Sequence, residues 1–368
     1  MHPYRVLVRK VSDLSTAVAE ALDFLEYDFA GKRIWVKPNL LGPHAPERSV
    51  TTDPELVRRV TRELKKRRAS AVWVADNPMG GHSEPLGDFL APTGVVAASE
   101  GCFRGAAETP VLVPLTSRFI TEVPVSSVVS EVDVILNLPV LKTHALTVMT
   151  GAIKNLFGVI PGIRKAHLHT LVRNGTEFAE LLVDIYQALP VPVLNVMDAL
   201  RGMDGQNGPS GGRSLSVGKL LAARNAVALD SVMAMMAGVK PDWIPTNRIA
   251  GARGLGPTCD GEIQIVGDFE PIPDFRLPSV WLAGAFTGIA GATFYRLVQR
   301  QPAAVIRRCT RCRRCADNCP TQAISMTPDP SIDRRRCITC YCCVEACPDR
   351  AMVVPSALRG LLRRLAGR

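Results

Sequence analysis

The chain has 368 residues, of which 47% are hydrophobic, 21% are charged and 5% are aromatic. This composition supplies a large apolar core and excludes both an intrinsically disordered chain and a charge-rich coiled coil. The net charge of +10 arises mainly near the C-terminus, because residues 301–368 contain 13 arginines and no lysine against 5 acidic residues. Since aromatic side chains do not interleave with these arginines, a nucleic-acid partner is not favoured.

The first 270 residues alternate between short apolar segments typical of buried strands and amphipathic segments typical of helices. We predict strands at residues 33–36, 71–75, 132–136 and 193–197. One helix is predicted from Pro54 to Leu64, with Asp53 as its N-cap, and another from Phe178 to Leu189. Strands separated by helices predict an α/β domain with a mostly parallel sheet over residues 1–270.

Residues 271–303 are predicted to be a linker or a packed helix. Within them, residues 277–295 carry no charge and contain Gly284 and Gly288 at a spacing that suits helix packing in membranes. A membrane span is therefore the alternative. Pro278, three glycines and several hydroxyl side chains make the segment less apolar than a bilayer requires, so we expect a soluble protein.

Residues 304–355 form a cysteine-rich module that repeats internally. Cys309 to Pro320 and Cys337 to Pro348 each have the pattern Cys-x2-Cys-x2-Cys-x3-Cys-Pro, which is typical of bacterial ferredoxins with two [4Fe-4S] clusters. In that pattern three cysteines of one repeat share a cluster with the fourth cysteine of the other. We therefore predict one cluster on Cys309, Cys312, Cys315 and Cys347, and a second on Cys337, Cys340, Cys343 and Cys319.

Paired structural zinc sites are the alternative, but zinc has no use for the third cysteine at this spacing. Cys342 is a ninth cysteine in the module, and we interpret it as a small buried residue, with a redox role as the alternative. The N-terminus lacks the apolar segment of a secretory signal, so a reducing cytoplasm is expected and a disulfide scaffold is not.

Arginines surround the predicted clusters and continue into the C-terminal tail. They offset the negative charge of the clusters and suit an acidic redox partner protein. Residues 356–368 are predicted to form a basic amphipathic helix, with four leucines on one face. We expect this helix to dock on its own protein, and contact with a membrane surface is the alternative.

Polar residues follow the predicted strands of the α/β domain, where the carboxyl ends of parallel strands meet at one edge. They are Lys37 and Asn39, Asp76 and Asn77, Asn137 to His144, and Asp198 to Gly212. The last segment contains five glycines between Gly202 and Gly212, which can bring backbone N–H groups against an anion. Each side chain taken singly can also be structural, and His167 with His169 lacks a third ligand for a metal.

Five motifs in order resemble the Domain of Unknown Function 362 family over residues 5–240. They are Lys37 to Leu40, Asn137 to His144, Gly151 to Gly158, Asp198 to Pro209 and Ala226 to Asp230. Members of that family are often fused to a two-cluster ferredoxin, so the resemblance implies an iron–sulfur protein of unestablished activity. Arg313 and Tyr341 depart from ordinary ferredoxins, which have glycine at these positions, and this concerns the backbone packing around each cluster.

We therefore predict a cytoplasmic iron–sulfur oxidoreductase that exchanges single electrons with a small anionic substrate. Lys37, Asn39, Lys142 and the glycine-rich segment are the expected binding groups, and His144 or Asp198 is the expected proton carrier. The alternative is a non-catalytic electron carrier whose α/β domain binds a partner protein or senses a metabolite. The sequence does not identify the substrate.

Overall fold

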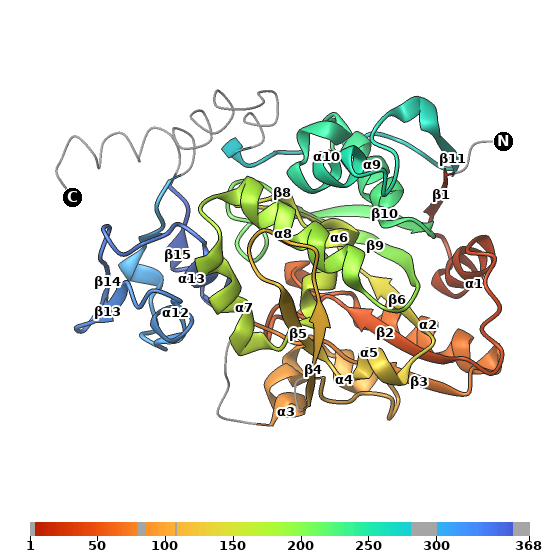
Figure 1. Ribbon diagram of the computed structural model, residues 1–368, viewed down its shortest axis with the longest axis horizontal. Coiled ribbons are helices and arrows are strands. Elements are labelled where there is room, and N and C mark those ends of the chain that lie inside the picture. Colours follow the sequence, from red (N-terminus) through yellow and green to blue (C-terminus); the bar gives the residue numbers. More distant parts are fainter. Residues whose placement is uncertain (1–3, 80–84, 107–108, 281–299, 356–368) are drawn as a thin grey trace.

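The computed structural model describes residues 4–79, 85–106, 109–280 and 300–355. Figure 1 shows a large α/β domain with a small C-terminal module, drawn in blue, beside it. One nine-stranded sheet forms the centre of the α/β domain. Its strands are β1 (Tyr4–Lys10), β2 (Arg33–Pro38), β3 (Ala71–Val74), β6 (Val134–Leu138), β7 (Val140–His144), β8 (Val148–Met149), β9 (Val193–Asp204), β10 (Arg213–Ala223) and β11 (Ile263–Gly267).

The sheet is mostly parallel, which confirms the predicted fold class. The strand order is β11, β1, β10, β9, β6, β2, β3, with β7 paired to β9 and β8 paired to β7. Among the described strands, five of the eight pairings are parallel. Strand β10 is antiparallel to both of its neighbours, because a hairpin joins it directly to β9. A separate two-stranded sheet pairs β4 (Pro110–Pro114) with β5 (Glu122–Ser126).

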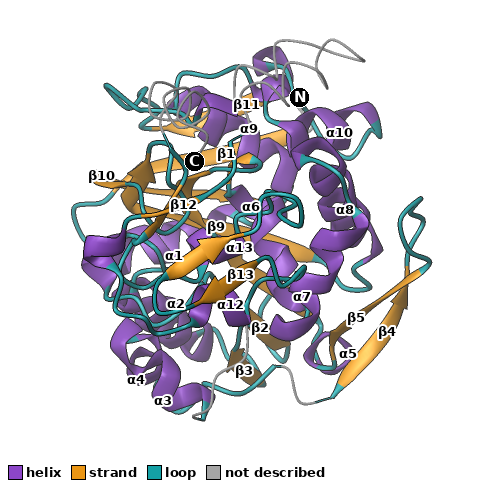
Figure 2. Ribbon diagram, turned by 90° about the vertical axis from the view of Figure 1, so that its left-hand side faces the viewer, coloured by secondary structure: helices purple, strands orange, loops and turns teal. Residues whose placement is uncertain are grey.

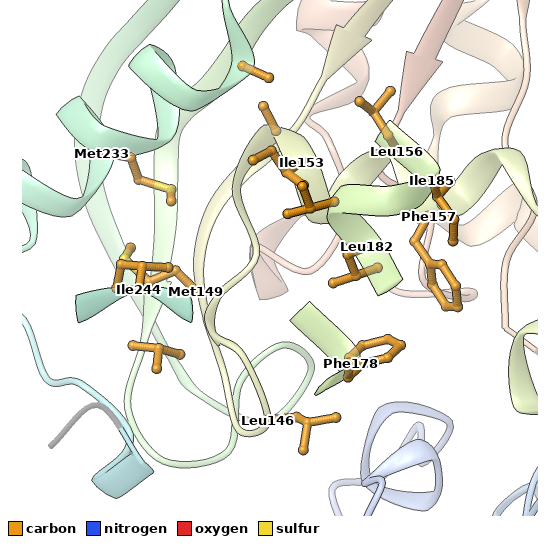
Figure 3. Close-up of a cluster of buried hydrophobic side chains, with 14 of the residues drawn as sticks. Leu146, Met149, Ile153, Leu156, Phe157, Phe178, Leu182, Ile185, Met233 and Ile244 are labelled. Atoms are coloured by element: carbon orange, nitrogen blue, oxygen red, sulfur yellow. The ribbon is translucent and has the colours of Figure 1, made fainter. Parts of the chain in front are cut away.

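Helices cover both faces of the sheet (Figure 2). They are α1 (Leu14–Phe24), α2 (Pro54–Lys66), α3 (Leu86–Leu90), α4 (Val95–Ala98), α5 (Val128–Glu131), α6 (Gly151–Asn155), α7 (Gly162–Leu168), α8 (Gly175–Ala188), α9 (Ala226–Met236) and α10 (Pro245–Ala252). Alternate residues of one strand enter different cores, since Ile34 and Val36 pack with α1 and α2 while Trp35 packs with the opposite helices. Figure 3 shows part of that second core, with Ile153 of α6 and with Leu182 and Phe178 of α8.

Helix α2 forms as its sequence predicts. The side chain of Asp53 accepts a hydrogen bond from the backbone N–H of Glu55, and Pro54 occupies the first helical position. Leu56, Val57, Val60, Thr61 and Leu64 make up its buried face. The loop that follows β2 leads directly into this helix. The helix therefore fixes the position of the residues at the carboxyl end of β2.

Two of the predicted loop segments are strands in the structure. Residues 137–138 belong to β6 and residues 140–144 to β7, and β9 continues from the predicted end at Met197 to Asp204. The extension of β9 is stabilised by pairing with β7 on one side and with β10 on the other. The glycine-rich segment is therefore reduced to the hairpin turn at residues 205–212.

The C-terminal module consists of two similar halves. Its elements are β12 (Ala303–Ala304), α12 (Arg314–Asp317), β13 (Ile324–Met326), β14 (Pro330–Ile332), α13 (Cys342–Glu345) and β15 (Met352–Val353). Arg313 and Tyr341 occupy equivalent positions before α12 and α13, with left-handed φ angles of 64° and 65°. The backbone shape usually supplied by glycine is thus kept with larger side chains, at a cost of about 1 kcal/mol or more per residue.

The module packs directly on the α/β domain, because Tyr341, Val344 and Val354 belong to the same buried apolar cluster as α6 and α8. Of the predicted linker, Ile272 and Leu277 are partly buried against that cluster and Val280 is buried within it. Residues 281–299, which include most of the uncharged segment, and the tail at residues 356–368 lie outside the described residues. Within the described ranges, no helix is both long and apolar enough to cross a bilayer.

Candidate functional site

Eight cysteines of the C-terminal module surround two cavities. The first cavity, of about 310 Å³, is lined by Cys309, Cys312, Cys315 and Cys347. The second, of about 320 Å³, is lined by Cys319, Cys337, Cys340 and Cys343. Each cavity therefore draws three cysteines from one repeat and the fourth from the other. Four converging sulfur ligands are the donor set that an iron–sulfur cluster requires.

Backbone N–H groups donate hydrogen bonds to two of these cysteine sulfurs, one in each repeat. The N–H of Ala323 donates to the Sγ of Cys319, and the N–H of Ala351 donates to the Sγ of Cys347, both at 3.2 Å. Such hydrogen bonds stabilise a sulfur that carries negative charge, as a cluster ligand does. Burial raises the pKa of Cys315 to about 11, so the free thiol is mainly protonated at neutral pH and metal binding releases its proton.

Cys342 is completely buried and lies in the wall of the second cavity. Its side chain is hydrogen-bonded to that of Cys340, and this contact with burial raises the pKa of the Cys342 thiol well above its usual value. A protonated thiol at this position can donate a hydrogen bond to a ligand sulfur. The structure therefore places the ninth cysteine beside the four-cysteine set of this cavity.

Lys37 lies at the carboxyl end of β2 and forms a buried ion pair. Its Nζ is 2.7 Å from Oδ1 of Asp76 and also donates to the carbonyl of Pro38, while Oδ2 of Asp76 accepts from the N–H of Leu40. Burial lowers the pKa of Lys37, and the Asp76 carboxylate opposes that shift. A Cβ atom at Gly158 would overlap both charged groups, so the close backbone approach requires glycine. Lys37 is thus already partnered.

Lys142, on β7, is also buried and satisfied inside the protein. Its Nζ donates to Oδ1 of Asn39 and to the carbonyl of Val50, each at 2.5 Å. Asn39 donates in turn to Asn155, and Asn155 donates to Asn137. Burial, with the nearby Lys154 ammonium, lowers the pKa of Lys142 to about 7. This chain of side chains fixes the orientation of the Asn39 amide.

His144, at the end of β7, joins the two parts of the chain. Its Nε2 lies 2.9 Å from Oε1 of Glu345 on α13, and its Nδ1 accepts hydrogen bonds from the N–H groups of Leu146 and Thr147. Burial and the Lys154 ammonium lower the pKa of His144 to about 4. Although burial alone would raise the pKa of Glu345, Lys154 and His144 bring it well below its usual range. A neutral imidazole therefore donates through Nε2 to a carboxylate.

Asp198 does not join these residues. One of its carboxylate oxygens accepts from the N–H of Asp53 and the other from the N–H of Leu200, so it braces the start of α2 against β9. Burial raises the pKa of Asp198 to about 7. Asp198 is not among the residues that line the pocket described below, although its carboxylate lies close enough to Lys142 to oppose the lowering of that lysine's pKa.

The glycine-rich hairpin faces the C-terminal module. The hydroxyl of Ser210 donates to the carbonyl of Val344, and Oδ1 of Asn207 accepts from the N–H of Val354. A Cβ atom at Gly208 would overlap the backbone of β7, so the hairpin packs tightly against that strand. Because protein groups occupy these contacts, the hairpin acts in docking, and the predicted anion contact has no support in the geometry.

A pocket of about 420 Å³ lies at the carboxyl ends of β2 and β3 and reaches the C-terminal module. Its polar lining residues are Asn39, Asp76, Asn77, Lys154, Asn155, Lys165, His169 and Glu345. Glu345 is the residue that brings the module into its wall, two positions after Cys343 and two before Cys347. Of the residues expected to form the site, the structure therefore places Asn39 in the wall, Lys37, Lys142 and His144 behind it, and Asp198 elsewhere.

Sequence reasoning missed the role of the cations in this pocket. Lys154 lies in the family-like motif Gly151 to Gly158, and the sequence alone does not distinguish it from a solvated side chain. Lys165 lies on α7, gave no signal in the sequence, and donates to the carbonyl of Asn77. Burial lowers the pKa of Lys165 to about 7, against the opposing effect of Asp76. His169 was considered only as a metal ligand.

Comparison with known proteins agrees with this two-part architecture. A family model described as "Domain of unknown function (DUF362)" matches residues 34–235, which is more than half of the chain. The chain belongs to this family. A model described as a 4Fe-4S dicluster domain matches residues 308–351 of this DUF362 protein, the span that contains both four-cysteine sets. The match supports an iron–sulfur protein.

One curated relative is the thylakoid-associated protein sll1697 of Synechocystis sp. (strain ATCC 27184 / PCC 6803 / Kazusa). It is 32% identical over 238 residues, which cover 62% of this chain and 70% of the relative. Among solved structures, a Thermotoga maritima protein has 12% identity and a TM-score of 0.37, with 58% of this chain and 55% of that chain covered. The lactate racemase apoprotein of Thermoanaerobacterium thermosaccharolyticum has 16% identity and a TM-score of 0.38, with 64% and 57% covered. The chain spans little more than half the length of either solved structure.

Proposed function

We propose that this DUF362 protein carries two [4Fe-4S] clusters and transfers electrons between a redox partner and a small anionic substrate. The proposed ligands are Cys309, Cys312, Cys315 and Cys347 for one cluster, and Cys337, Cys340, Cys343 and Cys319 for the other. The two cavities of similar size, each lined by one of these sets, support the assignment. When bound, such clusters supply or accept single electrons.

The observation that carries the oxidoreductase proposal is the position of Glu345. This side chain lies on the short helix that connects Cys343 to Cys347, and it also forms part of the pocket wall that contains Lys154 and Lys165. A molecule in the pocket is therefore separated from the cysteine sets by one short segment of chain.

The residues of the pocket have separate roles in this proposal. Lys154 binds the negative charge of the substrate, and Asn39, held by Lys142, orients it. Lys165 can also release a proton near neutral pH, because burial brings its pKa to about 7. Lys37 positions Asp76, and His144 positions Glu345. Asp198, which the structure uses to brace α2, is left out of the proposed proton pathway.

Electrons are proposed to enter at the exposed side of the first cavity. Cys312 is exposed, and Ile306, which is 45% exposed, lies beside Arg307 and Arg308. An apolar contact surrounded by cations suits a partner protein with an acidic docking surface. We propose a cytoplasmic location, with association to a membrane surface through residues 356–368. The thylakoid association in the name of the curated relative supports the membrane part of this proposal.

The test begins with anaerobic preparation of the full chain and analysis of its metal. We expect about eight irons and about eight acid-labile sulfides per chain, as two cubanes require. Stoichiometric zinc without sulfide would contradict the cluster assignment. The reduced protein is then mixed with pooled small anionic metabolites, and cluster re-oxidation is followed by absorbance. Re-oxidation by protein carriers alone would instead favour the non-catalytic electron carrier.

A further inference from the structure

The pocket between the two parts of the chain contains a buried acceptor without a partner. Asn77 is 2% exposed, and its Nδ2 donates to the carbonyls of Gly158 and Val159. These two bonds fix the orientation of the amide, because an amide oxygen could not replace Nδ2 against two carbonyls. Oδ1 of Asn77 is left buried with no hydrogen-bond partner among the described residues. A buried acceptor of this kind requires a donor from a ligand or an ordered water.

Lys154 supplies the complementary charge. Its side chain is half-buried in the pocket wall, and no hydrogen bond or ion pair to it is found within the described part of the chain. The Lys154 ammonium lies close enough to Glu345 to lower the pKa of that carboxyl group, but Glu345 is already held by His144 at 2.9 Å. Lys165, by contrast, donates to the carbonyl of Asn77. Lys154 is therefore the cation that is available to bind an anion.

An aromatic wall closes one side of the pocket. The ring of His169 is stacked on Phe178 with centroids 4.2 Å apart, and its centroid lies 6.1 Å from that of Phe157. Nδ1 of His169 is a second buried atom without a partner.

We propose that this pocket binds a small organic oxyanion that also carries a hydroxyl or amino hydrogen-bond donor. The anionic group lies against Lys154, and the donor satisfies Oδ1 of Asn77. This inference rests on the proposed function in taking the pocket as the substrate site, and it adds the class of molecule bound there. A metal cation is disfavoured by the two lysines, and an apolar ligand would leave Asn77 unpaired.

Four small molecules test separately whether the ligand needs a negative charge and whether it needs a hydrogen-bond donor. Glycolate has a carboxylate and a hydroxyl donor, methoxyacetate has its donor blocked, and glycolamide has no charge. Phosphoethanolamine combines a phosphate with an amino donor. Comparing it with glycolate therefore shows whether the pocket prefers a phosphate or a carboxylate. Binding of each to the oxidised, cluster-containing full chain is measured by saturation-transfer NMR and by calorimetry.

We expect glycolate or phosphoethanolamine to bind, and methoxyacetate and glycolamide to bind at least roughly tenfold more weakly, as loss of one strong hydrogen bond requires. Lys154→Met should weaken the charged probes by a similar factor. Lys66→Met, on the exposed face of α2, is the matched control and should leave binding unchanged. Equal binding of glycolate to the wild-type protein and to Lys154→Met would overturn the proposal, as would failure of both charged donor probes to bind the wild type.

The same samples separate this inference from the proposed function. Iron and sulfide content and the cluster absorbance are measured on every variant before binding. If these values are normal and the binding pattern fails, the ligand class is wrong while the two-cluster assignment stands. If iron and sulfide are absent from the wild type, the proposed function fails even where the probes bind as expected.

Discussion

Nε2 of His144 lies 2.9 Å from Oε1 of Glu345, although 201 positions separate these residues in the sequence. Both side chains are buried, with exposed fractions of 0% and 2%. The contact joins the end of β7 to the helix between two proposed cluster ligands, so the orientation of the C-terminal module depends on a pair that belongs to both parts of the chain. A buried carboxylate that loses its partner is strongly destabilising.

Replacement of His144 by phenylalanine should therefore lower the free energy of unfolding by about 1.5–3 kcal/mol, because the Glu345 carboxylate keeps its burial and loses a neutral hydrogen-bond donor. Glu345→Gln should cost much less, since a neutral amide oxygen still accepts from Nε2. Denaturant unfolding under anaerobic conditions measures both values. A His144→Phe variant as stable as the wild type would show that the His144–Glu345 pair contributes little to stability.

Lysine substitutions distinguish buried support from the pocket itself. Lys37→Met leaves Asp76 buried without its counter-charge and should destabilise the protein by about 3–5 kcal/mol. Lys142→Met leaves the acceptors of Asn39 and Val50 unsatisfied and should cost about 1–3 kcal/mol. Lys154→Met should be the least destabilising of the three, since the Lys154 side chain is half-buried and makes no hydrogen bond or ion pair within the described residues.

Melting temperatures of the three variants without ligand measure this order. The comparison is matched, because each substitution removes one ammonium group and keeps the apolar stem. A stable Lys37→Met protein would mean that Lys37 is free to bind ligand, as the sequence alone suggested. A strongly destabilised Lys154→Met protein would instead place that residue in the scaffold.

Much of the fold could be predicted because its signals are local. The strands at residues 33–36 and 193–197 are short and apolar, and Asp53 with Pro54 defines the start of α2. The cysteine spacing was equally informative, since ligand spacing reflects the chemistry of the bound group. Strand β7 was missed because Lys142 and His144 are polar, and polar residues usually indicate a loop. Tertiary hydrogen bonds satisfy these side chains, and the sequence does not show such partners.

The candidate site was less accessible to sequence reasoning. Lys37 and Lys142 were correctly expected near one edge of the sheet, but their partners, Asp76 and Asn39, already neutralise or bind them. The contribution of Glu345 depends on how two modules pack together, and no local pattern encodes that contact. Asn77 was noted as a residue after a strand, but only its burial distinguishes it from an ordinary loop amide.

The two cysteine sets give a direct test of the crossed ligand pattern. Cys319→Ala should remove the fourth ligand from the cavity lined by Cys337, Cys340 and Cys343, and so disable that cluster while the other keeps four cysteines. Cys342→Ala is the matched control, because this residue lies in the same wall outside the proposed set. Iron content and the electron paramagnetic resonance spectrum of the reduced protein are measured for both variants. Loss of the first cluster alone in Cys319→Ala would contradict the ligand assignment.

The basic surface beside the first cavity should accelerate electron transfer with an acidic protein. Replacing Arg307 and Arg308 by glutamate should lower the rate of cluster reduction by an acidic flavodoxin about tenfold or more at low salt, because electrostatic steering is lost. Lys65 and Lys66 on α2, changed to glutamate, give the same change in net charge at a distant site. Stopped-flow measurements at several ionic strengths compare the two variants. Equal slowing of both would show a general charge effect without a docking surface.

The buried ring of His169 should make stability depend on pH. Burial lowers its pKa from 6.5 to about 3 against the opposing effect of Glu345, so the unfolded chain binds a proton below pH 6.5 that the folded chain does not bind until the pH approaches 3. Stability therefore falls as the pH is lowered through that window, by up to about 1.4 kcal/mol per pH unit for this one group. His169→Phe keeps an aromatic ring against Phe178 and removes this contribution. Unfolding free energies from about pH 7 to about pH 5 should decline less steeply in the variant than in the wild type, whereas His167→Phe, at an exposed neighbouring position, should retain the wild-type slope. An unchanged slope in His169→Phe would show that this histidine takes up its proton in the folded protein.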